Sequence, residues 1–243
     1  MPELAYDLHI HSCLSPCGDK DMTPANIAGM AMLKGLRIIA LTDHNSVRNA
    51  PALIRAAEQY GIIALPGMEL TTQEEAHVLC LFAETEAALA FDAYVRERLR
   101  KVKNRAEIFG EQILMNENDE PLGEEEYLLI NATEIAFEDA GDAVCAHGGI
   151  MIPAHLDKES DSLLSSLGFI PPESTFSCAE IRDMNNLDRL RHAHPYLESC
   201  RIISNSDAHY LWDIHEAENR LSFPTERPEK REILELLSRR SEP

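Results

Sequence analysis

Two histidines, His9 and His11, stand two positions apart at the end of a short apolar run near the N-terminus. If this run is a strand, both side chains point to one face, because side-chain direction alternates along a strand with a period of two. Two imidazoles on one face at a strand end are typical of one edge of a metal site. Further imidazole and carboxylate side chains come later in the chain, most of them where another strand is predicted to end.

The elements that must position these side chains follow from the apolar patterns. Short apolar runs predict seven strands, and most are separated by helical patterns that begin or end at Pro, Ser or Gly signals. This alternation predicts an α/β fold, a parallel barrel-like sheet in one domain over residues 1–243. The predicted strands lie at 4–10, 37–42, 62–66, 77–82, 149–153, 178–182 and 201–204.

Chemistry in such a barrel gathers at the carboxyl ends of the strands. Most of the candidate ligands follow this rule, and His77 is the exception because it stands at the start of its strand. An antiparallel strand at 77–82, or an entry loop folded back over the barrel mouth, would explain it. The candidates that follow strand ends are His9, His11, His44, Glu69, His155, Asp207 and His209.

Residues 86–146 interrupt the alternation and are predicted to be a helical insertion between the fourth and fifth strands. Apolar residues spaced three and four apart from Val95 to Ile113 predict one face of a long helix. A second helix is predicted at about 124–139. Six basic side chains between Arg96 and Arg105 are interpreted as a solvent face paired with nearby acids, with a basic lid or an oligomer contact as the alternative.

Composition limits the function classes. The chain has 243 residues, 44% of them hydrophobic, and a net charge of −20. No apolar run is long enough to span a membrane and no signal segment is recognisable, so a soluble, cytoplasmic protein is predicted. The charge disfavours membranes and long nucleic acid as partners. A small anionic substrate stays compatible, because bound divalent cations reverse the local potential. The oligomeric state is left open.

The motifs together resemble the polymerase and histidinol phosphatase (PHP) family of metal-dependent phosphoesterases. They cover nearly the whole chain outside the insertion, and the family fold is a distorted seven-stranded (β/α) TIM-like barrel. The matching segments are Asp-Leu-His-Ile-His (7–11), Thr-Asp-His-Asn (42–45), Gly-Met-Glu (67–69), the His of Ala-His-Val (76–78), Pro-Ala-His (153–155) and Ser-Asp-Ala-His (206–209).

The resemblance implies a cluster of two or three divalent metal ions, with Zn²⁺, Mn²⁺ and Fe²⁺ all suited to mixed imidazole and carboxylate ligands. One ion would take His9, His11, Glu69 and Asp207. Glu69 would bridge to a second ion held by His77 and His155. A third would take His44, His209 and a ligand from the first loop.

That first loop, residues 12–22, departs from the family pattern, and two of its residues are candidates for the third site. Counting back from the predicted helix start at Thr23-Pro24, Asp19 falls where the family has Asp. Counting forward from His11, Cys17 falls where some members have His. Asp19 is favoured, and a thiolate at Cys17 would shift the site toward Zn²⁺.

The implied activity is hydrolysis of a phosphate ester in a small phosphorylated metabolite or nucleotide by a hydroxide that bridges two metals. Glu69, Asp207 and His209 are the predicted catalytic residues. Arg182 and Lys158 are predicted to grip the phosphate. The alternatives are phosphodiester cleavage in short oligonucleotides and amidohydrolase-like cleavage of C–N bonds.

Overall fold

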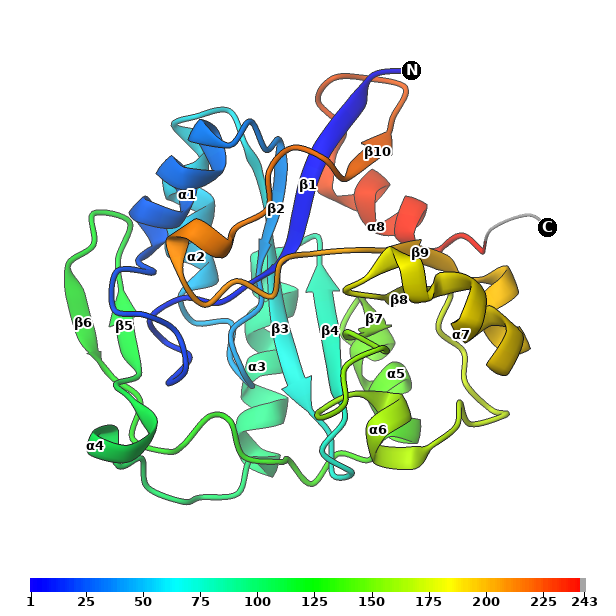
Figure 1. Ribbon diagram of the computed structural model, residues 1–243. Coiled ribbons are helices and arrows are strands. Elements are labelled where there is room, and N and C mark those ends of the chain that lie inside the picture. Colours follow the sequence, from blue (N-terminus) through cyan, green and yellow to red (C-terminus); the bar gives the residue numbers. More distant parts are fainter. Residues whose placement is uncertain (241–243) are drawn as a thin grey trace.

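The computed structural model describes residues 1–240, and its centre is a curled sheet of six strands in the order β10-β1-β2-β3-β4-β7 (Figure 1). A separate parallel pair, β8 and β9, and an antiparallel hairpin, β5 and β6, complete the sheets. The strands are β1 (Glu3–Ile10), β2 (Ile38–Leu41), β3 (Ile63–Thr71), β4 (His77–Phe82), β5 (Ile113–Met115), β6 (Pro121–Glu124), β7 (Gly149–Pro153), β8 (Cys178–Glu180), β9 (Arg201–Ile203) and β10 (Arg220–Ser222).

Helices connect and cover these strands (Figure 1). Helix α1 begins after the cap Thr23, whose hydroxyl accepts from the Asn26 N–H, and it has Pro24 at its first position as the sequence predicts. The α-helices are α1 (Pro24–Leu33), α2 (Ala50–Glu58), α3 (Thr85–Arg98), α4 (Ala106–Phe109), α5 (Phe137–Ala146), α6 (Leu163–Leu167), α7 (Leu187–Ala193) and α8 (Lys230–Ser238).

The sheet is buried on both faces, as the unbroken apolar run of β4 shows. Val78, Cys80 and Phe82 belong to the core shared with the covering helices. Leu79 and Leu81 alternate with them and point into a second core, which also contains Ile233 and Leu237 of α8. Alternation therefore divides one strand between two cores, and α8 packs on the core opposite to the one that the other helices share.

Strand direction explains the position of His77. Strands β1, β2 and β3 are parallel, but β4 is antiparallel to β3, with Thr71 paired to His77. The start of β4 therefore lies at the same edge as the end of β3. Strand β7 is antiparallel to β4, so its end at Pro153 returns to that edge.

The fold class is thus a mixed α/β fold with a curled sheet, and it differs from a regular (β/α)7 barrel. The antiparallel β4 follows β3 after a short turn without a helix, so the β/α alternation is broken there. The parallel pair β8 and β9 is connected to the six-stranded sheet near β7 and at β1. Leu156, which follows β7, donates its N–H to Glu180 O, and Leu8 of β1 donates its N–H to Oδ1 of Asn205, which follows β9.

The predicted long helix from Val95 to Ile113 is wrong. Helix α3 ends at Arg98, and the segment after it is extended. Its backbone pairs with a distant segment, because Leu128 donates its N–H to Val102 O and Asn104 donates to Glu126 O. The apolar spacing is therefore distributed over α3, a short α4 and strand β5, with Val102 half-exposed.

The predicted helix at 124–139 is also wrong, for the same reason. Residues 126–134 direct backbone hydrogen bonds to the 98–104 segment, and helix α5 begins only at Phe137. The middle of the 86–146 segment is thus mostly extended. The basic side chains at its start are partly paired: Arg96 donates to the buried Glu125, and Lys103 contacts Glu126 at 3.0 Å.

Candidate metal centre

Eight side chains from six places in the sequence meet at the edge where β1, β2, β3 and β7 end and β4 begins. The strand directions bring them together, as expected for a site at the carboxyl edge of a barrel. All but His77 and His209 have less than a tenth of their side chain exposed. The eight are His9, His11, His44, Glu69, His77, His155, Asp207 and His209.

Glu69 lies at the centre, and its two carboxylate oxygens face different imidazoles. Oε1 lies 2.9 Å from His77 Nδ1 and 3.0 Å from His155 Nε2. Oε2 lies 3.1 Å from His44 Nδ1 and 3.3 Å from His11 Nε2. A carboxylate flanked in this way has the placement that a ligand shared by two cations requires.

A group of four donors forms on one side of Glu69. The Nε2 atoms of His9 and His11 are 3.2 Å apart, and Asp207 Oδ1 lies 3.4 Å and 3.3 Å from them. Two imidazole nitrogens that face each other need either a shared proton or a cation between them. The set His9, His11, Glu69 and Asp207 has donor atoms within 4.8 Å of one another, which fits a divalent metal.

Two further groups of donors share members with the first. His44, Glu69 and His77 form one, and His11, His44 and His209 form the other. His44 Nδ1 is buried and lies 3.1 Å from Glu69 Oε2, but the angles do not make a hydrogen bond, a sign that this nitrogen is placed for a ligand that the protein itself does not supply. The donor chemistry and this unsatisfied nitrogen fit a cluster of divalent transition metals.

The first loop contributes neither of its two candidates to these groups. The Asp19 backbone N–H donates to His209 O at 2.8 Å, while its side chain accepts from the Asp21 N–H. Cys17 is exposed. Asp19 thus holds His209 in place through the backbone, and a ligand role for Asp19 stays a prediction.

Glu180, at the end of β8, is a functional residue that the sequence reasoning missed. Its Oε2 lies 3.0 Å from His9 Nδ1 and accepts from the His155 N–H at 2.9 Å. Its Oε1 accepts from Asn205 Nδ2 at 2.8 Å. A carboxylate behind an imidazole fixes the ring tautomer and leaves Nε2 free for a metal. Glu180 ends β8 in the structure, but the predicted strand extended to residue 182, so the strand-end rule pointed to Arg182 instead.

Hydrogen bonds through Ser15 to Asp43 orient the His11 ring. Its Nδ1 lies 3.0 Å from Ser15 Oγ, and the Ser15 hydroxyl donates to Asp43 Oδ1 at 2.7 Å. The hydroxyl therefore accepts from His11 Nδ1–H, which leaves Nε2 as the free donor atom. Asp43 also accepts from both the N–H and the hydroxyl of Ser12. The hydrogen bonds that this buried carboxylate accepts therefore fix the conformation of the first loop.

Three non-glycine residues in the left-handed region lie at the site. Asn45 has φ of 47°, His155 of 31° and Asp207 of 53°. Such backbone conformations cost free energy and persist where surrounding contacts impose them. At Asp207 the contacts come from Asp7, which is buried and accepts from the N–H groups of Ser206 and His215.

Burial and neighbouring charges shift the pKa values of the cluster residues. Burial lowers the pKa of His11, but the carboxylates of Asp207 and Glu69 outweigh it and raise that pKa to about 9. Burial and the neighbouring His11 lower the pKa of His209 to about 4. Burial would raise the pKa of Glu69, but the surrounding histidines hold it well below its usual value. Glu69 is therefore ionised, as a metal ligand must be.

The two predicted substrate anchors lie in different settings. Lys158 Nζ is 3.4 Å from Asp207 Oδ2, so its ammonium group reaches the cluster. Arg182 is exposed, and its backbone N–H donates to Asp157 Oδ1. The structure thus brings Lys158 to the candidate site, while Arg182 stays a prediction.

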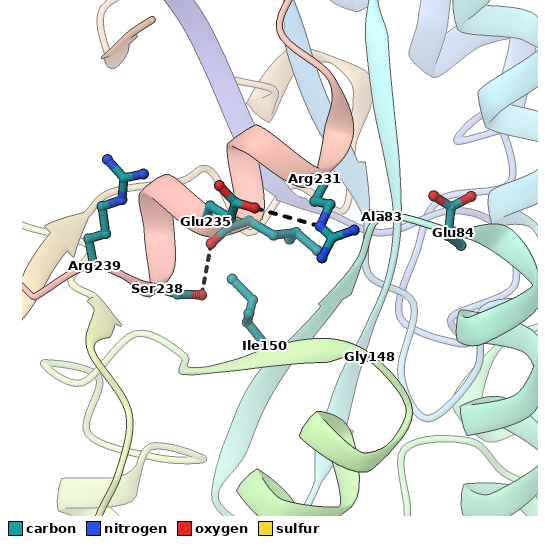
Figure 2. A pocket seen from close by; sticks show the side chains of 9 residues that line it. Ala83, Glu84, Gly148, Ile150, Arg231, Glu235, Ser238 and Arg239 are labelled. Atoms are coloured by element: carbon teal, nitrogen blue, oxygen red, sulfur yellow. Dashed lines mark hydrogen bonds and ion pairs between the residues drawn. The ribbon is translucent and has the colours of Figure 1, made fainter.

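A cavity of about 630 Å³ lies elsewhere, between α8 and the sheet (Figure 2). Three of its polar side chains have partners within α8: Arg231 Nε is 3.6 Å from Glu235 Oε1, and the Ser238 hydroxyl donates to Leu234 O. No cluster residue lines it. Its size therefore does not make it the functional site.

The PHP domain family model matches residues 7–139, more than half of the chain. The chain therefore belongs to the PHP domain family, as the motifs predicted. It is 28% identical over 107 residues to an uncharacterized protein of Methanocaldococcus jannaschii, covering 41% of this chain and 61% of that protein. It is 33% identical over 70 residues to a 5'-3' exoribonuclease of Haemophilus influenzae, covering 29% of this chain and 24% of that enzyme. The matches thus span less than two thirds of either relative.

Solved structures share the fold. A lesion-specific endonuclease, endonuclease Q of Pyrococcus furiosus, superposes with a TM-score of 0.67 at 19% identity, over 98% of this chain and 57% of that one. A Bifidobacterium adolescentis protein assigned as a metal-dependent phosphoesterase gives 0.60 at 18% identity, over 90% and 92% of the two chains.

The prediction that excluded long nucleic acid as a partner is contradicted. An endonuclease Q structure with a 27-mer duplex substrate shares this fold, with a TM-score of 0.56 at 19% identity over 86% of this chain and 50% of that one. The prediction rested on the net charge of −20, which is a sum over the whole molecule. Cations bound at the site would change the potential that a substrate meets there.

Within residues 1–240, no helix combines the length and the apolar character needed to cross a membrane.

Proposed function

We propose that this protein is a metal-dependent phosphoesterase. The observation that carries the proposal is the central position of the Glu69 carboxylate among the imidazoles proposed for different ions. Its Oε1 faces His77, His155 and His9, and its Oε2 faces His11 and His44. We assign His9, His11, Glu69 and Asp207 to one ion and His77 and His155, with Glu69, to a second. His44 and His209 would complete a third site, with Asp19 from the first loop as its proposed further ligand.

When bound, a pair of divalent metals supplies an activated water at neutral pH and neutralises charge on the phosphoryl oxygens. The chain's own residues prepare the site for this. Glu180 and Ser15 fix the rings of His9 and His11 so that both Nε2 atoms face the cluster.

Lys158 is the proposed phosphate anchor. Its ammonium group lies beside Asp207 and is 28% exposed, so it is accessible to a substrate while still near the metal ligands. A compact, mobile cation suits a phosphoryl oxygen.

His209 stays neutral near pH 7 because its pKa is lowered to about 4, and its Nδ1 is hydrogen-bonded to Asp207 O. It is therefore suited to be a ligand or a proton acceptor rather than an acid. Arg182 is kept as a weaker candidate anchor.

A second candidate, cleavage of phosphodiesters in nucleic acid, is favoured by the shared fold with endonuclease Q and by the partial match to the exoribonuclease. Both candidates hydrolyse a P–O bond, and they differ in whether the phosphorus carries one ester group or two.

The proposal is tested by measuring phosphate release from a panel of phosphorylated metabolites, nucleotides and short oligonucleotides, with metal content determined on the same sample. We expect the wild type to release phosphate or mononucleotides, and Glu69→Ala to lose bridging metal and activity together. Glu97→Gln, a change at a side chain that is 80% exposed, is the matched control. Full activity of Glu69→Ala, or hydrolysis of amides without any phosphate ester, would overturn the proposal.

A further inference from the structure

A cavity of about 310 Å³ lies between the first loop, the insertion and the segment after His209. Its volume is at the lower end of the range for small-molecule pockets, which is about 300–1,000 Å³, so it fits one group of nucleoside size. Its walls include Pro16, Cys17, Gly110, Glu111, Ile113 and Tyr210.

The cavity lies beside the candidate metal centre, because Asp19, one of its lining residues, donates its backbone N–H to His209 O at 2.8 Å. Tyr210 directly follows His209, a member of the cluster. Pro16 directly follows Ser15, whose hydroxyl contacts His11 Nδ1. The cavity therefore lies next to the cluster on its His209 side.

Gly110 contributes to the wall of the cavity by a close backbone approach to Pro16. Its φ is +101°, and a Cβ atom there would lie 2.0 Å from the Pro16 carbonyl oxygen. The insertion thus packs directly on the first loop, and Ile113 donates its N–H to Cys13 O nearby. This contact makes the cavity a part of the fold rather than a gap between independent loops.

Tyr210 offers an aromatic face, with the residue 53% exposed. The charged residues that line the cavity are two acids, Asp19 and Glu111, and one base, Lys20. This balance disfavours a second phosphate and favours a neutral group with hydrogen-bonding edges. A nucleobase meets both conditions, because it stacks on an aromatic ring and carries polar edges.

We propose that this cavity binds the nucleoside of the substrate, with Tyr210 as the surface on which the base stacks. The inference rests on the proposed phosphoesterase function and adds the substrate class, a nucleoside phosphate. The nucleoside belongs either to a free nucleotide or to the last nucleotide of a strand.

The test compares adenosine 5'-monophosphate, the dinucleotide ApA and ribose 5-phosphate as substrates of the metal-loaded enzyme. We expect the wild type to prefer a substrate with a base over ribose 5-phosphate. Tyr210→Ala should reduce this preference, measured as a ratio of kcat/KM values, by about 5- to 150-fold, the range for stacking of one base. Tyr210→Phe should retain the preference, because the ring stays. The matched control is Tyr60→Ala, at a half-exposed tyrosine after α2, which should retain it as well. A higher kcat/KM for adenosine 5'-monophosphate indicates a free nucleotide as the substrate, and a higher kcat/KM for ApA indicates the last nucleotide of a strand.

Binding of adenosine, which has no phosphate, separates this inference from the proposed function. Calorimetry should detect adenosine on the wild type and on Tyr210→Phe, and weaker binding to Tyr210→Ala by the same factor. If adenosine binds in this way but no phosphate ester is cleaved, the proposed function fails and the pocket stands. Equal binding of adenosine to wild type and Tyr210→Ala, or no binding at all, overturns the pocket.

Discussion

The carboxylate of Glu180 lies 3.0 Å from Nδ1 of His9, on the side of the ring that faces away from the metal ligands. The same carboxylate accepts from the His155 N–H and from Asn205 Nδ2. Glu180 therefore ties together two candidate ligands and the loop before Asp207 while it touches none of the positions where a metal would lie.

Glu180→Gln should weaken metal binding without unfolding the protein. Glutamine has one acceptor oxygen for three donors, so the orientation of His9 or of His155 loses its support. Loss of such an outer partner typically costs about 10- to 100-fold in metal affinity. Competition with a fluorescent chelator measures the affinity, and wild-type affinity in Glu180→Gln would contradict the orienting role.

Asp43→Asn should loosen the first loop. Asp43 accepts three hydrogen bonds from Ser12 and Ser15, and Ser15 in turn holds His11. We expect a loss of about 1–3 kcal/mol in the free energy of unfolding, from buried donors left without an acceptor, and weaker metal binding. Asp92→Asn is the control, since Asp92 is a buried acceptor for Ser46 and Val47. It should destabilise the protein without changing metal affinity, and equal effects on metal affinity would refute the relay through Ser15.

Gly110→Ala should separate the insertion from the first loop. The added Cβ would meet the Pro16 carbonyl, in a backbone conformation that already disfavours a side chain. We expect a loss of about 1–3 kcal/mol and faster proteolysis within residues 99–136. Gly123→Ala is the matched control, because Gly123 also has positive φ, at +146°, but nothing within 4 Å of the added atom. If both substitutions have the same effect, backbone strain and not the Pro16 contact is responsible.

Metal binding should release protons and strengthen as the pH rises from 7 to 9. Burial lowers the pKa of His11, but Asp207 and Glu69 raise it to about 9, so in the metal-free protein this imidazole is protonated at pH 7. A metal binds the neutral ring, so each unit of pH below 9 should cost about tenfold in affinity from this group. Titration with Mn²⁺ in buffers of different ionisation enthalpy measures the protons released. Affinity that is independent of pH in this range would contradict the protonated state of His11.

The existence of the strands was the most predictable part of the molecule, although β3 runs to Thr71 and not to residue 66 as predicted, so that Glu69 lies within the strand. The run from His77 to Phe82 is a strand in the structure at the same residues, because an apolar run between polar turns has few other ways to be buried. Its direction could not be read from the run itself. Pairing of Thr71 with His77 sets that direction, and it explains why a ligand stands at the start of a strand.

The insertion was poorly predicted, because periodicity over residues 95–113 does not reveal competing long-range pairing. The 99–104 backbone bonds to residues 126–133, and this pairing replaces the helix. At the site, the motif residues come together, whereas Glu180 was overlooked although it also ends a strand. Its partner His9 is separated from it by 171 positions, a relationship that one sequence without relatives does not disclose.

The central claim is that Glu69 is shared by two metal ions, and anomalous diffraction from crystals loaded with Mn²⁺ or Zn²⁺ tests it most directly. We predict separate peaks on the two sides of the Glu69 carboxylate, one bounded by His9, His11 and Asp207 and the other by His77 and His155, each with an oxygen of Glu69 at about 2.0–2.2 Å. A single peak, or peaks that leave Glu69 without a metal contact, would contradict the claim.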